Sequence, residues 1–402
     1  MPALNTAKNA ALENVSWMEP LLPPEGERRL EDLAVDLVSK ANALAGQVNP
    51  VVQQSIGTLV RSMNCYYSNL IEGHDTHPRD IDRALAKNYA REPQRRALQL
   101  EAVAHIEVQT QIDEKKDDQN DPTSTEYILW LHREFCERFP EELLLVENPD
   151  THEKIQVLPG KLRTDDVAVG RHVPPSAVVL PEFLRRFEDA YDPAHHSKLR
   201  RIVAVGAAHH RLLWIHPFYD GNGRVARLMS YSTLRRLGIG STLWSVARGL
   251  ARNMNRYKEL LMAADEPRRN DLDGRGSLSQ AALTDFCEFF LQVSIDQVDF
   301  MESLLQPTEL LRRIEIFVED EVRAGRLARG SYPVLREAVL AGNLDRSLAR
   351  QLTGFRERMG RTVISRLLEK GLLTSAGPKE PLRLGFPLDV VERWFPKLYP
   401  VT

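Results

Sequence analysis

Hydrophobic and polar residues along most of this chain follow the period of an α-helix. The stretch LEDLAVDLVSKANALAG, residues 30–46, places apolar side chains every three or four residues, as an amphipathic helix requires, and Gly46 is expected to follow its last turn. Further helices are expected at 50–72, 78–88, 92–112, 124–139, 181–193, 197–214, 223–237, 249–264, 278–304, 308–325, 333–341, 346–353 and 357–370. The spacing therefore predicts a mainly α-helical fold.

Two stretches break this helical period. Residues 154–173 hold β-branched side chains at short spacing around Gly160, which predicts a β-hairpin or flap. Towards the end, GLLTSAGPKEPLRLGF (371–386) has the pattern of a strand, a turn and a strand after three short helices, as in a winged helix-turn-helix domain. The expected units are an N-terminal helical region (1–115), a core (123–304) and a winged helix-turn-helix domain (305–402).

Composition limits the class of protein more than its activity. With 402 residues the chain is long enough for two or three domains, and its 43% hydrophobic and 27% charged residues are typical of a globular protein in water. The net charge of −3 by itself predicts neither a nucleic-acid nor a membrane partner. We see no signal-peptide pattern and no apolar run long enough to cross a bilayer. The widely spaced Cys65, Cys136 and Cys287 predict buried reduced thiols, which favours a cytoplasmic protein.

The sequence HPFYDGNGRVAR, residues 216–227, interrupts two predicted helices with many polar groups of different kinds. Gly221 and Gly223 lie just before a new helix, where free backbone N–H groups and the positive end of the helix dipole form a natural anion site. Both glycines let a phosphate approach the backbone closely. Asn222 between them tolerates a left-handed conformation and can donate a hydrogen bond. This part of the sequence indicates a phosphate-binding loop.

The charged residues of the motif add chemistry to that loop. Arg224 and Arg227 lie three residues apart on one helix face, and guanidinium groups bind phosphate oxygens in bidentate fashion. Asp220 could supply the single carboxylate that a phosphate-bound Mg²⁺ often needs, and His216 can accept a proton near neutral pH. Taken one at a time, the same residues could cap a helix, turn the chain or face solvent. Together they favour metal-assisted transfer of a phosphate-containing group with a histidine base.

The motif resembles the signature of Fic-domain proteins, HxFx[D/E]GNGRxxR, and matches every fixed position. The resemblance implies a Fic fold for the core and transfer of AMP from ATP to a Ser, Thr or Tyr hydroxyl of a target protein, with release of pyrophosphate. It implies that His216 takes the proton of that hydroxyl and that Asp220 holds Mg²⁺, or Mn²⁺, between the phosphates. The groups that it places at the phosphates are the backbone amides of Gly221, Asn222 and Gly223, then Arg224, and Arg227 at the γ-phosphate.

Two further regions have an expected role because of the resemblance. Relatives use a β-hairpin flap to pair with the backbone of the target, and KLRTDDVAVGRH (161–172) is the matching stretch, with a plain structural ribbon as the alternative. The docking residues expected in the flap are Lys161, Leu162, Arg163 and Val169.

Tyr257 falls where relatives contact the nucleoside, although core packing explains its position nearly as well.

The sequence SNLIEG ends the helix expected at 50–72. Glu72 would face the negative end of the helix dipole, which is easier to understand if a cation lies nearby, and Gly73 is expected to stop the helix. Exposed glutamates near helix ends are common, so the residues alone favour an incidental placement. The resemblance implies an inhibitory helix with the motif [S/T]xxxE[G/N], matched by Ser68, Glu72 and Gly73. Glu72 would then pair with Arg227 in place of the γ-phosphate. In some relatives the same glutamate supports removal of AMP.

The C-terminal module allows a second class of partner. Over residues 341–370 basic side chains outnumber acidic ones seven to three, which suits phosphate contacts with DNA, although winged helices also pack or bind proteins. We therefore expect an autoinhibited protein adenylyltransferase whose partners are ATP and a target protein, the chain itself included, with no membrane partner. DNA binding and a homodimer are further expectations. The alternatives are AMP removal, another nucleotide or phosphate transfer, and a DNA-binding regulator that senses nucleotide.

Overall fold

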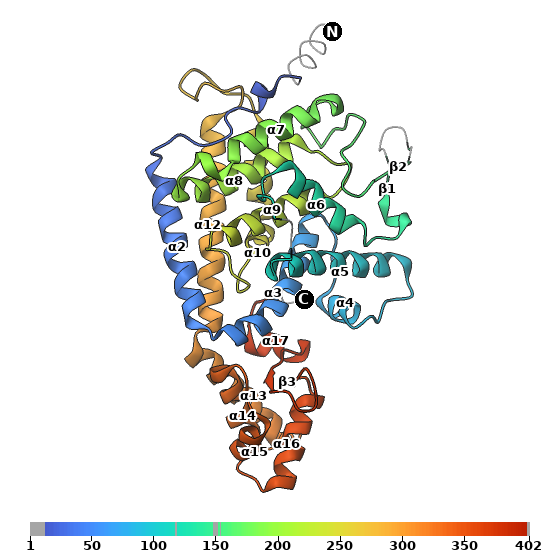
Figure 1. Cartoon of the computed structure of the whole chain (residues 1–402), viewed down its shortest axis with the longest axis vertical. Coiled ribbons are helices and arrows are strands. Elements are labelled where there is room, and N and C mark those ends of the chain that lie inside the picture. Colours follow the sequence, from blue (N-terminus) through green and yellow to red (C-terminus); the bar gives the residue numbers. More distant parts are fainter. Residues whose placement is uncertain (1–12, 117–118, 148–151, 153, 400–402) are drawn as a thin grey trace.

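The computed structural model describes residues 13–116, 119–147, 152 and 154–399, and these are mainly α-helical (Figure 1). The predicted mainly helical fold class is confirmed. The named strands of the described part form two short antiparallel pairs, β1 (Leu145–Glu147) with β2 (Lys154–Gln156) and β3 (Leu373–Thr374) with β4 (Arg383–Leu384).

The helices before residue 306 begin and end close to the predicted positions. Those of the N-terminal region are α2 (Arg28–Gln47), α3 (Pro50–Ile71), α4 (Pro78–Leu85) and α5 (Pro93–Asp113). Those of the central region are α6 (Thr125–Cys136), α7 (Leu180–Tyr191), α8 (Lys198–Ile215), α9 (Asn222–Arg236), α10 (Val246–Arg252), α11 (Met254–Asp265) and α12 (Gln280–Leu305). Clear start signals explain the agreement, because Pro opens α3, α4 and α5 and the side chains of Ser124, Ser197 and Ser279 cap α6, α8 and α12.

Helices α2, α8, α9 and α12 form the centre of the core. Figure 1 shows α12 running beside α2 over the height of the core, and α8 packs against α12 on one side and α9 on the other. Gly206 lets α8 approach α12 closely, because a Cβ at this position would lie 3.2 Å from the Cβ of Phe290 and 3.3 Å from the Cα of Cys287. Since α8 leads directly into the motif at His216, this packing sets the position of the motif.

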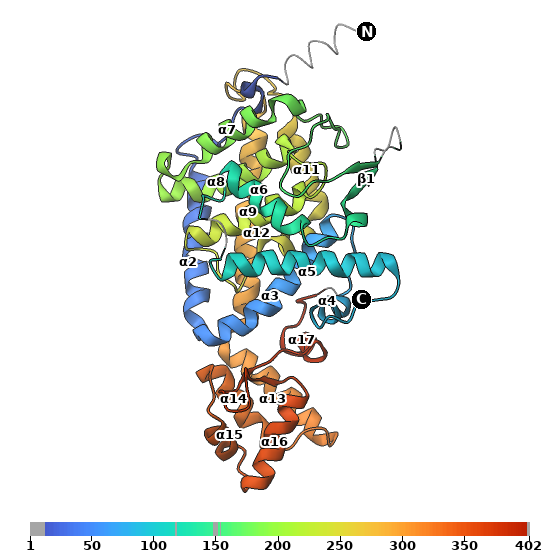
Figure 2. The ribbon, with the colours of Figure 1, turned by 45° about the vertical axis from the view of Figure 1, so that its right-hand side comes forward.

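The C-terminal helices form a lobe at the lower end of both views (Figures 1 and 2). They are α13 (Pro307–Arg323), α14 (Ser331–Ala341), α15 (Arg346–Leu352), α16 (Glu357–Glu369) and α17 (Leu388–Trp394). Leu344 lies beside the β3–β4 pair and exchanges two backbone hydrogen bonds of 2.8 Å with Leu382. The winged helix-turn-helix assignment and the three domain limits stay predictions.

The hairpin predicted over residues 154–173 is confirmed only in part, because β2 lies in this stretch but pairs with β1, which precedes it. The hairpin strands are β1 and β2, and the stretch 161–172 contains only one isolated bridge, between Val169 and His172. Gly160 has a positive φ of 67° for another reason: the chain here passes so close to α6 that a Cβ would lie 2.9 Å from the Cβ of Arg133. A glycine needed for a close approach looks the same in sequence as a glycine needed for a turn.

Several helix boundaries also differ from the prediction. α4 ends at Leu85 and not at residue 88, α6 ends at Cys136 and not at residue 139, and α17 was not predicted. α2 continues through Gly46 to Gln47. The helix expected at 249–264 is divided into α10 and α11 at Asn253, whose side-chain Nδ2 donates to the carbonyl of Gly249 at 2.9 Å. A side-chain amide that bonds to the preceding turn competes with the helical backbone pattern.

All three cysteines are free and buried, as predicted. Burial raises the pKa of the Cys287 thiol to about 12, which keeps it protonated at neutral pH. Across the described ranges, no helix combines the length and the apolar character that crossing a bilayer requires.

Gly206→Val should destabilise the protein by about 1–3 kcal/mol, because the added side chain overpacks the α8–α12 contact. Calorimetric unfolding measures the change. The matched control is Gly46→Ala, since Gly46 is an exposed helical glycine with nothing within 4 Å of an added Cβ. That change should stabilise the protein by up to about 1 kcal/mol. Equal shifts in the two variants would contradict the close α8–α12 approach.

Candidate active site

His216 lies at the end of α8, where the chain turns into the loop before α9. Its backbone is left-handed (φ 50°, ψ 61°), which is uncommon for a residue with a side chain, and its N–H donates to the carbonyl of Leu212 at 3.1 Å. The Nε of Arg163 donates to the carbonyl of His216 at 2.9 Å, and the backbone N–H of Arg163 donates to the carbonyl of Pro217 at 3.0 Å. Because Arg163 is 2% exposed, it holds this turn from inside the protein.

The surroundings of His216 keep its imidazole neutral. Burial, together with nearby His172 and Arg163, lowers the pKa of His216 from its usual 6.5 to about 4. A neutral imidazole has one ring nitrogen that accepts a proton. At pH 7 the side chain is therefore in the form that a general base requires.

The loop between His216 and α9 is closed by a side-chain amide. Asn222 accepts from the N–H of Phe218 at 3.0 Å and donates to the carbonyl of Phe218 at 2.8 Å, while the Phe218 ring stacks on His132 with centroids 3.8 Å apart. Gly221, with φ 81°, turns the chain directly into α9. The first N–H groups of a helix have no intrahelical acceptor, so the start of α9 offers an anion site with Gly223 in its first turn.

Arg224 and Arg227 bring two buried positive charges to this helix start. Their side chains are 5% and 4% exposed. Arg227 donates from Nε to Ser68 Oγ at 2.9 Å and from Nη2 to Glu72 Oε1 at 2.5 Å. Arg224 Nη2 lies 3.3 Å from Glu101 Oε1. A buried guanidinium is costly unless an anion is nearby, and here both anions come from helices outside the motif.

The end of α3 brings Glu72 to the two arginines. The N–H of Gly73 donates to the carbonyl of Leu70 at 3.1 Å, and the N–H of His74 donates to the carbonyl of Asn69 at 2.9 Å. With φ 85° at Gly73, these bonds form a Schellman motif, in which a glycine follows the last helical turn. Gly73 therefore stops the helix, as the sequence predicted.

The carboxylate of Glu72 lies over the anion site. A Cβ added to Gly223 would overlap Glu72 Oε1, so the carboxylate covers the backbone at the first turn of α9. The side chain of Glu72 is 30% exposed, and its partial burial opposes ionisation, but the charges of Arg227 and Arg224 together outweigh this and lower the pKa of the carboxyl below its usual value. In the structure, an anion of the protein itself therefore lies where an anionic ligand would be expected.

Two residues of α5 belong to this cluster and carry no sequence signal. Glu101 bridges Arg224 and the Nδ1 of His74, which lies 2.9 Å from Glu101 Oε2; this hydrogen bond raises the pKa of His74. His105 is fully buried, and neither ring nitrogen has a partner among the described residues. Burial together with the charges of Arg227 and Arg224 lowers the pKa of His105 to about 3, so the ring adds no third positive charge.

Asp220 is open to solvent beside the loop. Its side chain is 55% exposed and lies 4.0 Å from Arg224 Nη1. Within the described part of the chain, no group of three or more His, Cys, Asp or Glu side chains could hold a metal. One accessible carboxylate fits a metal that is carried by phosphates, and it does not fit an all-protein metal cage.

Tyr257 and the flap residues do not gather in one accessible site. Tyr257 is 2% exposed and its hydroxyl bonds to His209 at 2.7 Å, so in this structure it packs in the core behind the arginines. Arg163 is likewise buried, and its guanidinium donates to the carbonyls of His216, Asp165 and Pro175. Lys161 and Leu162 lie next to Arg163 in sequence and are not buried, and Val169 is 41% exposed.

Tyr219, a variable position of the motif, attaches the stretch after Arg163 to the loop. Its hydroxyl accepts from the backbone N–H groups of Thr164 and Asp165, both at 3.1 Å, and donates to Asp165 Oδ2 at 2.5 Å. The sequence offered no signal for this contact, because the partners are 54 and 55 residues away.

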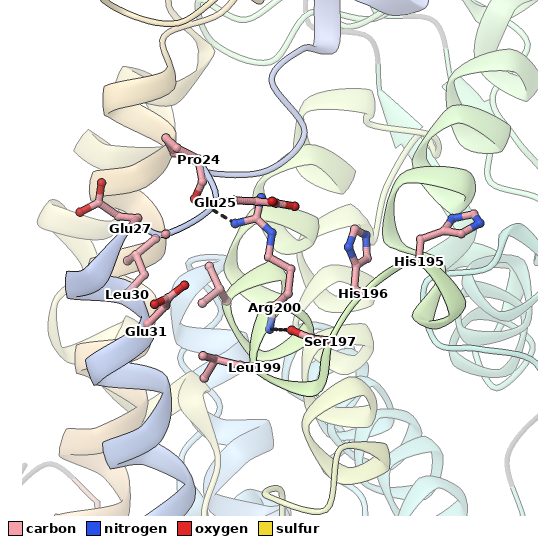
Figure 3. Close-up of a pocket in the computed structure, with 12 residues that line it drawn as sticks. Pro24, Glu25, Glu27, Leu30, Glu31, His195, His196, Ser197, Leu199 and Arg200 are labelled. Atoms are coloured by element: carbon pink, nitrogen blue, oxygen red, sulfur yellow. Dashed lines mark hydrogen bonds between the residues drawn. The ribbon is translucent and has the colours of Figure 1, made fainter.

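The pocket drawn in Figure 3 lies at the other end of α8. It has a volume of about 380 Å³ and lies between the first turns of α2 and α8, beside His195 and His196. The guanidinium of Arg200 at its edge bonds to the carbonyl of Pro24 at 3.0 Å. Since α8 has 18 residues and rises 1.5 Å per residue, this pocket is roughly 25 Å from His216. The pocket is therefore separate from the candidate active site.

Comparison with known proteins finds relatives of the part that carries the motif. Residues 122–234 match the model of the Fic/DOC family. The chain is 42% identical over 79 residues to Protein adenylyltransferase Fic of Drosophila willistoni, which covers 20% of this chain and 16% of that protein. It is 29% identical over 175 residues to the protein of the same name from Drosophila yakuba, which covers 43% of this chain and 31% of that protein. The chain thus spans less than a third of the length of these curated relatives.

Solved structures with the same family name are more distant in sequence. A Fic family protein from Desulfovibrio desulfuricans G20 has 18% identity and a TM-score of 0.49, covering 88% of this chain and 96% of that chain. Fic-1 from C. elegans has 20% identity and a TM-score of 0.48, covering 69% of this chain and 71% of that chain. The similarity to the Fic/DOC family therefore rests on residues 122–234, which contain the whole motif from His216 to Arg227, while α3 and the C-terminal lobe lie outside the matched segment.

Proposed function

We propose that this protein transfers AMP from ATP to a Ser, Thr or Tyr hydroxyl of a target protein, and that its resting state is inhibited. The observation that carries the proposal is the cluster at the start of α9, where two buried guanidiniums and the backbone at Gly223 lie against a carboxylate of the protein itself, one short loop after the neutral imidazole of His216. These are the parts of a phosphate site beside a base. The match over residues 122–234, and relatives named protein adenylyltransferase, support AMP as the transferred group.

In this reaction the hydroxyl oxygen of the target attacks the α-phosphorus of ATP while His216 takes the hydroxyl proton. The bond from the α-phosphorus to the bridging oxygen breaks, and its electron pair leaves with pyrophosphate. The N–H groups at the start of α9, with Arg224 and Arg227, stabilise the negative charge on the phosphate oxygens. Arg163 and Asn222 act as positioning residues, since they hold the turn at His216 and the loop.

Asp220 is the residue that would hold a divalent metal, and ATP would bring the remaining oxygen ligands. Mg²⁺ commonly binds one or two protein carboxylates together with phosphate oxygens, and Mn²⁺ accepts the same oxygen donors. When bound, such an ion neutralises phosphate charge. The exposure of Asp220, at 55%, leaves its carboxylate accessible for this role.

Glu72 would be the inhibitor of the transfer. Its carboxylate pairs with Arg227 and covers Gly223, so it supplies the charge that a terminal phosphate of ATP would otherwise supply. ATP bound beside it would place its γ-phosphate elsewhere, and the α-phosphorus would lose its in-line alignment with a hydroxyl near His216. Removal of AMP from a modified protein, the alternative reaction, would by contrast retain Glu72 in place.

The remaining expectations are part of this proposal. The target docks along the accessible residues Lys161, Leu162 and Val169, and the chain itself is one candidate target. Tyr257 reaches a nucleoside only if the core around it opens, because it is 2% exposed. We further propose that the protein forms a homodimer and is located in the cytoplasm.

DNA binding by the C-terminal lobe is a second candidate function. Helix α16 buries Val363 and Leu367 and exposes Arg358, Arg361 and Arg366 on its other side. Exposed arginines on one helix face suit contacts with DNA phosphates.

Glu72→Gly should raise the transfer of label from α-phosphate-labelled ATP to protein by about tenfold or more, because it frees Arg227 and uncovers Gly223. Adding His216→Ala should abolish the label. The matched control is Glu114→Gly, since Glu114 occupies the same C-cap position at the end of α5 and is exposed. It should label like the wild type. A Glu72→Gly protein that binds ATP and labels no more than the wild type would contradict the inhibition.

The pH profile of the Glu72→Gly variant tests the state of His216. Because the pKa of His216 is about 4, its imidazole stays neutral as the pH falls from about 8 to about 6. The kcat/KM for labelling should stay level over this range and fall only as the pH nears the pKa, where protonation removes the acceptor. Circular dichroism at each pH separates this loss from unfolding. A midpoint near 6.5, the usual value for histidine, would contradict the lowered pKa of His216.

Replacing Arg358 and Arg366 together by alanine should weaken binding to duplex DNA and lower the slope of log affinity against log salt by about one per lost phosphate contact. Fluorescence anisotropy over a salt series measures both quantities. Arg312→Ala, at an exposed arginine of α13 outside α16, is the control and should leave them unchanged. Unaltered affinity in the double variant would exclude α16 as the DNA-binding surface.

A further inference from the structure

Helix α3, which ends just before Glu72, is held at its start by the C-terminal lobe. The Nδ2 of Asn49, the N-cap residue of α3, donates to the carbonyl of Ala341 at 3.3 Å, at the end of α14. Gly342 lies so close to this residue that an added Cβ would be 2.6 Å from Asn49 Oδ1 and 2.7 Å from the Cβ of Val51. The lobe and the first turn of α3 are therefore in direct contact.

A second contact reaches α3 much nearer to the active site. After α17, which packs on α4, the chain turns back as the tail segment, defined as residues 395–399 (Figure 2). Its residues Leu398 and Tyr399 are 1% and 6% exposed. The hydroxyl of Tyr67 donates to the carbonyl of Leu398 at 3.1 Å, and the rings of Tyr66 and Tyr399 meet edge to face with centroids 5.6 Å apart.

Besides Tyr66 and Tyr67, Arg248 also contacts the tail segment and holds it in one conformation. Arg248 on α10 donates from Nη2 to the carbonyl of Lys397 at 3.0 Å, and its guanidinium lies 3.5 Å from the ring centroid of Phe300 and 5.8 Å from that of Tyr67. Lys397 is left-handed, with φ 65°, a conformation that costs free energy for a residue with a side chain. Such a conformation persists where the surrounding contacts determine it, so the tail segment is a specific contact.

The tail contact and the inhibitory contact are adjacent in sequence. Tyr67 bonds to the tail segment, and the next residue, Ser68, accepts from Arg227 Nε at 2.9 Å through its hydroxyl and from Arg227 Nη2 at 3.2 Å through its carbonyl. The same guanidinium pairs with Glu72 one turn later. A continuous path of contacts therefore joins the C-terminal lobe to the site at α9.

We propose that the C-terminal lobe controls the inhibition through the tail segment: contacts of the tail with Tyr66 and Tyr67 hold the end of α3 so that Glu72 stays on Arg227. The inference rests on the proposed function and adds the regulation of the same site. When the tail leaves, two buried aromatic rings of α3 lose their cover and the last turns of the helix loosen. A ligand of the lobe that favours the released tail would then activate the enzyme, in proportion to its preference for that state.

The test uses two variants of the full chain, Tyr399→Ala and Tyr67→Phe. Tyr399→Ala removes the ring that packs on Tyr66, and Tyr67→Phe removes only the hydroxyl that bonds to Leu398 and retains the packing. We expect transfer of the α-phosphate label to rise about tenfold in Tyr399→Ala, within the usual range of coupling between sites, and less in Tyr67→Phe. In the Glu72→Gly background neither change should raise the label further, because the inhibitor that they release is absent.

The matched control is Tyr191→Phe. Tyr191 also is buried and donates its hydroxyl to a backbone carbonyl, that of Leu21 at 2.6 Å, but it lies on α7 and not beside α3. It should label like the wild type, which separates control of α3 from a general loss of stability.

Hydrogen exchange provides a readout that does not need activity. Amides of residues 66–72 should exchange faster in Tyr399→Ala than in the wild type, with those of α7 unchanged. If Glu72→Gly labels strongly while Tyr399→Ala and Tyr67→Phe label like the wild type, the inference is wrong and the proposed function stands. If Glu72→Gly does not label, the proposed function is wrong, and hydrogen exchange alone tests the tail contact. Unchanged protection of the amides of residues 66–72 in Tyr399→Ala would then show that the tail segment does not hold the end of α3.

Discussion

Two guanidinium groups, those of Arg224 and Arg227, lie almost fully buried at the start of one helix, and most of the surrounding structure supplies what they require. Removing a charge from water costs several kcal/mol unless an opposite charge and hydrogen bonds compensate. Here the compensation comes from Ser68 on α3, from Glu72 directly after α3, and from Glu101 on α5. The N-terminal helices are thus part of the site, and a phosphate-containing ligand would have to compete with carboxylates that are already in place.

Burial and nearby positive charge account for the neutral state of two histidines close to this site. His105 is fully buried and His216 is half-buried near positive charge, and the pKa of each is well below 6.5, so neither adds a further cation. For His216 the same neutral state is the one that accepts a proton. Arg227 and Arg224 keep the carboxylate of Glu72 ionised, whereas burial together with His172 and Arg163 lowers the pKa of His216, so different neighbours set the charge of each group.

Helix α3 is the element that joins the parts of the molecule. Its first turn contacts the end of α14, its aromatic pair Tyr66 and Tyr67 contacts the tail segment, and its end supplies Glu72 to the arginines. Because the tail segment contacts Tyr67 and Arg227 contacts the next residue, Ser68, a change at the lobe can reach α9 through the last turns of this one helix. This arrangement gives the C-terminal lobe a physical connection to the site whichever partner it binds.

The sequence alone determined the features that depend on neighbours along the chain. Helix period was enough to locate most helices, although not α17 or the division between α10 and α11, and the ordered spacing from His216 to Arg227 was enough to indicate a base beside an anion site. Where one local signal has two physical causes, the prediction failed: Gly160 marks a close approach to α6 and not a hairpin turn.

Only the tertiary structure decided the contacts between residues far apart in sequence. The pairing of Arg227 with Glu72 spans 155 residues, and the bond from Tyr67 to Leu398 spans 331. Glu101 and His105 acquire their roles solely because α5 packs against the motif, and Arg163, expected on an exposed flap, is buried as the support of the turn at His216. Local sequence sets backbone propensity and side-chain chemistry. Burial and the charges of distant neighbours decide which carboxylate meets which guanidinium, and these depend on how the helices pack.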